Sequence, residues 1–120
     1  MNQSKPVIVY VGNEADSTQF KNESGWVVFS APALRDALAQ TIFSYPDAIV
    51  IDATHDMVVA EDTYYHLRTI NHPPIIILSD MPLRWNMPKD VPVTVISPNT
   101  NSYDLMATIN DYLSTTVIAS

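Results

Sequence analysis

Five short apolar runs recur along the chain, and each is followed by a longer segment of different character. Continuous runs of Ile and Val are typical of strands that a parallel sheet buries on both faces. Pro, Gly, Asn, Asp and Ser bound most of these runs, and these residue types favour turns. The pattern predicts strands at Pro6–Val11, Trp26–Phe29, Pro46–Asp52, Ile75–Leu78 and Val93–Ile96.

The segments between the runs differ in how strongly they predict helices. Apolar residues recur at helical spacing in 34–42, 57–70 and 105–113, which indicates three amphipathic helices. The polar segment 14–24 predicts only a short, weak helix. We expect Asp16-Ser17 to cap that helix and Gly25 to end it.

The alternation of strands and helices predicts one α/β domain over residues 1–120, because parallel strands need crossover connections. A doubly wound five-stranded parallel sheet, in the strand order 2-1-3-4-5, is the economical solution for this length. Prolines between Asp80 and Pro92 make the fourth helix short or missing. Residues 115–120 are predicted to form a tail.

Charge and composition exclude several classes of protein. The chain has 6 Lys and Arg against 13 Asp and Glu, a formal net charge of −7 with no basic stripe. Such a charge repels phosphate backbones, so we expect no direct nucleic-acid binding. No stretch approaches the roughly 20 apolar residues of a membrane helix, and no targeting segment is evident. We therefore expect a soluble cytoplasmic domain without disulfides, since the chain has no Cys.

The order and spacing of several segments resemble the receiver domain of bacterial two-component response regulators. The resemblance spans roughly Pro6 to Leu113. It is carried by Gly25-Trp26-Val27-Val28 with Ala31, by Asp36-Ala37-Leu38, by Pro46-Asp47-Ala48-Ile49-Val50-Ile51-Asp52, and by Pro74-Ile75-Ile76-Ile77-Leu78-Ser79. The third of these segments resembles the strand that ends at the family's phosphoacceptor aspartate.

The resemblance assigns roles to a small set of residues. Asp52 stands at the phosphoacceptor position, and Ser79 stands where a hydroxyl hydrogen-bonds the transferred phosphoryl group. The family's acidic pair, which binds Mg²⁺, is replaced by Gly12-Asn13, so Asn13 and Glu14 are the metal-ligand candidates beside Asp52. Ser97 occupies the position of the family's lysine.

These replacements indicate a degenerate receiver-like domain, because phosphoryl transfer depends on positive charge around the transferred group. We expect a non-enzymatic module of two-component signalling that is not efficiently phosphorylated and needs no cofactor, with Mg²⁺ bound only if the site is active. It would bind a protein partner or form a homodimer through the 80–113 face, with Arg84 and Trp85 as anchors.

Other interpretations stay open at this point. The domain could be a working receiver phosphorylated on Asp52, with Glu14 or Asp16 in place of the missing acidic pair. It could also be a flavodoxin-like module that binds a small molecule, although the scarcity of Gly in the turns speaks against a phosphate ligand. The simplest alternative gives Asp52 a structural role, capping the next helix or accepting hydrogen bonds from loop amides.

Overall fold

Five parallel strands form one sheet in the order β2-β1-β3-β4-β5, which confirms the predicted topology. The computed structural model describes residues 5–54, 57–68, 73–81, 93–97 and 102–119. The Ile- and Val-rich runs form the strands because β-branched side chains pack well on a pleated surface buried on both sides. The strands are β1 (Val7–Val11), β2 (Val27–Ala31), β3 (Ala48–Asp52), β4 (Ile75–Leu78) and β5 (Val93–Ile96).

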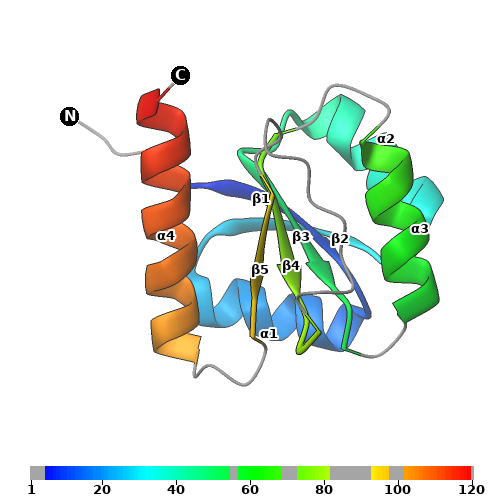
Figure 1. Cartoon of the computed structure of the whole chain (residues 1–120), viewed down its shortest axis with the longest axis horizontal. Helices are drawn as coiled ribbons and strands as arrows, with labels where there is room; N and C mark the ends of the chain where they lie inside the picture. Colours follow the sequence, from blue (N-terminus) through cyan, green and yellow to red (C-terminus); the bar gives the residue numbers. More distant parts are fainter. Residues whose placement is uncertain (1–4, 55–56, 69–72, 82–92, 98–101, 120) are drawn as a thin grey trace.

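Helices cover both faces of the sheet, as a doubly wound fold requires (Figure 1). The described residues contain four helices, with α4 on one side of the sheet and α2 and α3 on the other. They are α1 (Glu14–Ser24), α2 (Leu34–Ser44), α3 (Met57–Leu67) and α4 (Ser102–Ala119). The connection from β4 to β5, where the fourth helix was expected to be short or missing, lies outside the described residues from 82 to 92.

Alternate residues of each strand contribute to two separate cores. One face packs against α2 and α3, and the other against α1 and α4. The first core contains Val9, Val11, Ala37, Ile49, Ile51, Ala60, Tyr64, Leu67, Ile75 and Ile77. The second contains Ile8, Tyr10, Phe20, Ala48, Val50, Ile76, Leu78, Leu105, Ile109 and Leu113.

The helix α1 forms as predicted, but its cap was predicted at the wrong residues. Asn13, not Asp16-Ser17, is the N-cap, and its side-chain oxygen accepts a hydrogen bond of 2.7 Å from the backbone N–H of Asp16. Asn13 caps the helix because it precedes Glu14 directly and has the extended backbone geometry typical of an N-cap residue. Gly25 ends the helix as predicted, in the left-handed conformation with φ of 69°.

The last helix is longer than the sequence suggested. Residues 115–119, predicted as a tail, are helical, because neither Gly nor Pro occurs between Ser102 and Ala119 to end α4. The helix α3 ends at Leu67, and residues 69–72 lie outside the described part of the chain. Within the described residues, no helix combines the length and the apolar character needed to cross a membrane.

Candidate functional site

Asp52 lies at the carboxyl edge of the sheet, where the strand order reverses between β1 and β3. It is the last residue of β3, half-buried, and it pairs with Leu78 of β4. Val11 pairs with Ile51, so the residue after β1, Gly12, lies beside Asp52. Ligands of open α/β sheets collect at this kind of position, which makes the surroundings of Asp52 the candidate site.

Two neutral residues supply the hydrogen bonds of the Asp52 carboxylate. The phenolic O–H of Tyr10 donates to Oδ2 at 2.7 Å. The backbone N–H of Thr54 donates to Oδ1 at 2.9 Å, and the Thr54 hydroxyl also donates to Oδ1. Both oxygens of the carboxylate are therefore bonded by the protein itself, which confirms the expectation that Asp52 accepts hydrogen bonds from a loop amide.

Tyr10 reaches Asp52 from the second core. Its ring is 4% exposed and lies 5.3 Å from the ring of Phe20, centroid to centroid. Burial raises the pKa of the Tyr10 phenol well above its usual value, and the hydrogen bond to Asp52, the charge of Asp52 and the charge of Asp16 add to this shift. Tyr10 is therefore a protonated donor across the physiological pH range.

Gly12 leaves the space through which the Tyr10 ring passes. A Cβ atom at position 12 would lie 2.9 Å from Cε1 of Tyr10 and 3.1 Å from Cβ of Asp52. Both distances are shorter than the 3.5–4.0 Å that is optimal between carbon atoms. The position that the resemblance gives to an acidic side chain has no room for one here.

Asn13 and Glu14, the metal-ligand candidates beside Asp52, both lie at the start of α1. Asn13 is committed to α1, with its amide oxygen bonded to the N–H of Asp16 and its Nδ2 donating to the Asp16 carboxylate at 3.0 Å. Glu14 is exposed in the first turn of the same helix. The described residues contain no group of three His, Cys, Asp or Glu side chains arranged to hold a metal ion. Asp52 itself accepts hydrogen bonds from Tyr10 and Thr54, and Asn13 is hydrogen-bonded to Asp16, so neither predicted ligand is directed at a shared cation position in the described structure.

The two predicted serines end neighbouring strands, β4 and β5. Ser79 is buried, and its Oγ accepts a hydrogen bond of 3.0 Å from the backbone N–H of Met81. Ser97 is exposed and its Oγ donates to Oδ1 of Asp80 at 3.4 Å. The hydrogen bonds described for these serines thus lie within the β4 and β5 ends and do not involve Asp52. Arg84 and Trp85, the predicted partner anchors, lie outside the described residues.

Two small cavities flank Asp52. One, of about 210 Å³, lies between α1 and α4 and is lined by Tyr10, Asp16, Gln19, Phe20, Glu23, Asp52, Thr54, Leu78, Leu105 and Met106. The other, of about 240 Å³, lies over the reversal point of the sheet and is lined by Val11, Gly12, Asn13, Pro32, Asp52, Val59 and Ala60. No Lys or Arg is among the described residues that line either cavity.

Sequence reasoning missed Tyr10 and Thr54 as partners of Asp52. A signal existed for each. Thr54 stands two residues after an Asp, the spacing of an Asx turn. Tyr10 is the one aromatic residue of an otherwise aliphatic strand, and a buried tyrosine hydroxyl usually needs a hydrogen-bond partner.

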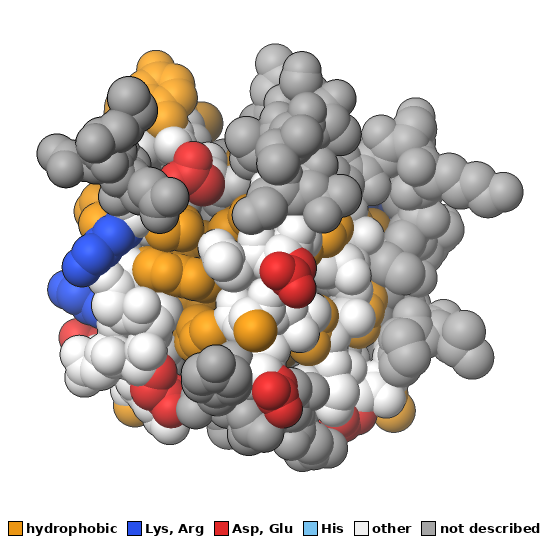
Figure 2. Space-filling model, turned by 90° about the vertical axis from the view of Figure 1, so that its left-hand side faces the viewer, with side chains coloured by type: hydrophobic (Ala, Val, Ile, Leu, Met, Phe, Trp, Pro, Cys, Tyr) orange, Lys and Arg blue, Asp and Glu red, His pale blue; other side chains and the backbone are white. Residues whose placement is uncertain are grey.

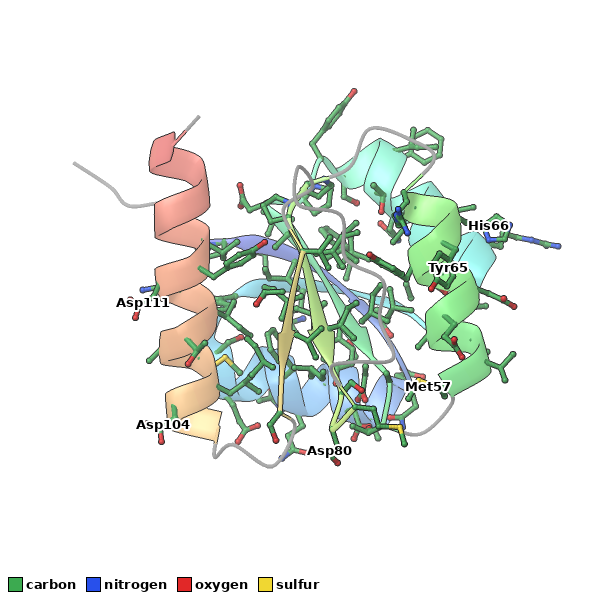
Figure 3. The ribbon with its side chains drawn as sticks, in the orientation of Figure 1. Met57, Tyr65, His66, Asp80, Asp104 and Asp111 are labelled. Atoms are coloured by element: carbon green, nitrogen blue, oxygen red, sulfur yellow. The ribbon has the colours of Figure 1, made fainter. Side chains whose placement is uncertain are left out.

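The side of the molecule formed by α4 combines carboxylates with an apolar area (Figure 2). Asp104 and Asp111 are exposed and point away from the sheet, and Asp80 lies at its carboxyl edge (Figure 3). A shallow hollow of about 320 Å³ between α1 and α4 is lined by Glu23, Ser24, Trp26, Met106, Ala107 and Asn110. This face belongs in part to the 80–113 segment predicted to bind a partner.

Of three comparisons with known proteins, the search of solved structures identifies the fold. A scan against protein-family models and a search of curated proteins found no match. Among solved structures, the N-terminal domain of the lantibiotic response regulator NsrR is 25% identical with a TM-score of 0.71, covering 93% of this chain and 99% of that one. The chemotaxis response regulator CheY4 of Vibrio cholerae is 18% identical, with a TM-score of 0.71 and coverage of 92% and 99%.

The pseudo-receiver domain of the CikA protein is also similar, at 15% identity and a TM-score of 0.59, with 91% of this chain and 97% of that chain covered. The chain therefore has the fold of response-regulator receiver domains, as the sequence resemblance implied.

Proposed function

We propose that this domain is a receiver-type module of two-component signalling that acts by binding a protein and not by accepting a phosphoryl group at Asp52. The observation that carries the proposal is the state of the Asp52 carboxylate, whose two oxygens are bonded by Tyr10 and Thr54. A nucleophile that attacks phosphorus needs a free oxygen lone pair aimed at the phosphoryl donor. Here three protein donors are directed at the carboxylate, one at Oδ2 and two at Oδ1, and they compete with a phosphoryl donor for its lone pairs.

The charges around Asp52 support the same conclusion. Phosphoryl transfer is catalysed almost entirely by positioning and by positive charge on the transferred group. The cavity between α1 and α4 is lined by Asp16 and Glu23, and no Lys or Arg is among the described residues that line either cavity at Asp52. Ser97, at the position that the resemblance gives to a lysine, is uncharged and bonded to Asp80. Within the described part of the site, a phosphoryl dianion at Asp52 would lie near the carboxylates of Asp16 and Glu23 and near no Lys or Arg.

A small-molecule-binding role has less support. Pockets for small ligands usually measure about 300–1,000 Å³ and bury most of their ligand. The cavities beside Asp52 measure about 210 and 240 Å³, below that range. The flavodoxin-like alternative therefore has no described cavity of suitable size at the edge where such folds bind ligands.

The binding surface that we propose is the 80–113 face, used by a protein partner or by a second copy. Its described part presents exposed Asp80, Asp104 and Asp111, and Arg84 and Trp85 remain proposed anchors outside the described residues. Because carboxylates dominate the described part, a partner with a basic surface would associate faster at low salt than at high salt.

Phosphorylation of the purified domain tests the central point. The protein would be incubated with acetyl phosphate and Mg²⁺, and its intact mass would be measured alongside that of the Asp52→Asn variant. We expect both proteins to keep their mass. A Mg²⁺-dependent gain of one phosphoryl group in the wild type, absent from Asp52→Asn, would establish a working phosphoacceptor and remove the proposal.

The proposed surface is tested separately. Sedimentation velocity at several concentrations reports self-association, and affinity capture from the native host reports other partners. A variant with Asp104→Lys and Asp111→Lys changes only exposed positions of α4, so its fold is expected to persist. Loss of the captured complex or of the dimer in this variant is the expected result, whereas unchanged association would place the interface elsewhere.

A further inference from the structure

We infer that Tyr10 and Gly12 form a matched pair that puts a phenolic hydroxyl at Asp52 and bars a divalent cation from that carboxylate. The inference rests on the proposed function, because it explains physically why the receiver-type edge would not bind Mg²⁺. The resemblance identified Gly12 only as a position where the family's acidic pair is replaced, and it assigned no role to Tyr10. The Tyr10 ring occupies the space beside Gly12, and its hydroxyl donates a hydrogen bond to the Asp52 carboxylate.

The geometry follows from strand alternation. Side chains two residues apart on a strand point to the same face, so Tyr10 and position 12 share the face that carries Val50 and Asp52. The ring of Tyr10 runs along this face past Gly12 and ends with its hydroxyl 2.7 Å from Oδ2 of Asp52. A side chain at position 12 would have to occupy the same volume.

Glycine is required at position 12 because a Cβ atom would be too close to its neighbours, and not because the backbone there is left-handed. Its φ is outside the left-handed region, since Gly25 is the one described glycine with positive φ. A Cβ at Gly12 would meet Tyr10 at 2.9 Å and Asp52 at 3.1 Å, whereas a Cβ at Gly25 would meet nothing within 4 Å. The two glycines are therefore constrained for different physical reasons, and Gly25 is a natural control.

The Tyr10 ring is held by aromatic packing on the side of Phe20, although a cavity of about 210 Å³ borders it elsewhere. Tyr10 is 4% exposed and packs against Phe20, whose ring in turn lies 5.9 Å from that of Trp26. Interiors packed this closely transmit strain instead of absorbing it. A methyl group at position 12 is thus expected to displace the Tyr10 ring, the Asp52 side chain or both.

The hydrogen bonds to the Asp52 carboxylate are expected to disfavour cation binding, as the packing of the Tyr10 ring does. A hard cation at Asp52 would need a free carboxylate oxygen and further oxygen ligands nearby. Both Asp52 oxygens already accept hydrogen bonds, and the Asn13 amide is bonded to Asp16. The Tyr10 hydroxyl provides neutral stabilisation of the carboxylate where the cation would provide charge.

A double-mutant cycle tests the steric pairing. Gly12→Ala would be made in the wild type, in Tyr10→Leu and in Tyr10→Phe, and urea midpoints would be compared. We expect Gly12→Ala to lower the midpoint in the wild type and in Tyr10→Phe, because the clash involves a ring carbon that phenylalanine keeps. In Tyr10→Leu the effect of Gly12→Ala should shrink to less than about half, since the coupling between contacting residues is then removed.

The control for the cycle is Gly25→Ala, which should lower the midpoint by the same amount in all three backgrounds. Equal effects of Gly12→Ala with and without the aromatic ring would overturn the steric pairing. These variants are single or double changes of small size, so the cycle gives an answer even if larger rebuilding of the site fails to fold.

Cation binding tests the second half of the inference. Mn²⁺ binding would be measured by electron paramagnetic resonance for the wild type, for Tyr10→Leu/Gly12→Asp, and for the latter with Asp52→Asn. We expect the rebuilt site to bind Mn²⁺ at least about tenfold more tightly than the wild type, because it adds a second carboxylate and frees Oδ2 of Asp52 from the Tyr10 hydroxyl. Adding Asp52→Asn should abolish the gain.

Two outcomes would overturn this half. One is a folded rebuilt variant that binds Mn²⁺ no more tightly than the wild type, and the other is a gain in affinity that persists when Asp52→Asn is added. Neither outcome depends on the phosphorylation assay, so the inference and the proposed function fail independently.

Discussion

Tyr10 donates a 2.7 Å hydrogen bond to Asp52 across 42 positions of the chain. The two residues lie on β1 and β3, the adjacent strands between which the order of the sheet reverses. The bond therefore ties the central strands together through their side chains, in addition to the backbone ladder. A hydrogen bond to an ionised acceptor is stronger than one between neutral groups, so this contact should contribute measurably to stability.

Removing the Tyr10 hydroxyl is the direct measurement of that contribution. Tyr10→Phe keeps the ring and leaves one carboxylate oxygen of Asp52 without its buried donor, which should lower the free energy of unfolding by about 1–3 kcal/mol. Urea denaturation measures the change. Thr54→Val is the matched variant, because Thr54 is exposed and its backbone N–H still bonds Asp52. We expect the loss in Tyr10→Phe to exceed that in Thr54→Val, because the Tyr10 hydroxyl is the buried donor, and the reverse order would contradict this prediction.

Alkaline pH should destabilise the wild type more than Tyr10→Phe. The folded protein raises the pKa of Tyr10, so the unfolded chain releases the phenolic proton first, at about pH 10. The stabilising contribution is fully present below that pH and is lost as pH rises above it. Burial also raises the pKa of Tyr64, but that residue is present in both proteins. The difference between their unfolding free energies, measured from about pH 9 to pH 11, should therefore narrow, and a constant difference would refute the prediction.

Asn13 should behave as a helix cap and not as a ligand. Asn13→Ala removes the bond to the N–H of Asp16 and is expected to cost about 1 kcal/mol of stability. Asn13→Asp keeps a capping oxygen but loses the donor to the Asp16 carboxylate, so its cost should be intermediate. Thermal unfolding monitored by circular dichroism gives the order, and an unchanged melting temperature in Asn13→Ala would show that the cap is dispensable.

Gly25→Ala should cost about 1 kcal/mol, because alanine is strained at a φ of 69°. The new methyl group meets nothing within 4 Å, so the whole effect is conformational. Gly25→Asn should cost less, since asparagine tolerates the left-handed conformation better than alanine. Chemical denaturation of the three proteins tests this order, and equal stabilities of the Ala and Asn variants would speak against it.

The fold was predictable because each strand coincides with a short continuous run of mainly apolar residues in the sequence. The residues Ile75–Leu78 and Val93–Ile96 form strands with the bounds that the sequence predicted. Helix ends were less predictable, since they depend on single contacts. The Asn13 cap forms because the backbone leaves β1 in extended geometry, a fact that composition alone does not state. The end of α4 was placed too early because no breaking residue marks it.

The sequence indicated where Asp52 lies in the fold, but not which residues hydrogen-bond its carboxylate. Asp52 was expected at the end of its strand, where it lies, and the resemblance placed Gly12-Asn13 and Ser97 at the positions of the family's acidic pair and lysine. The bond from Tyr10 was not visible, because it joins residues distant in the chain and depends on ring direction and on the empty volume at Gly12. Long-range side-chain contacts of this kind are a property of packing, which periodicity does not encode.

The space shared by the Tyr10 ring and position 12 also fixes an order of mutation. While the ring is present, any residue larger than glycine at position 12 meets it at close range, so a change at position 12 alone is penalised. A change at position 10 that removes the ring opens the volume, and only then can position 12 accept a side chain. A sequence that gains a side chain at position 12 is therefore expected to lose the aromatic ring at position 10 first. In the reverse change, position 12 must become glycine before position 10 can become tyrosine.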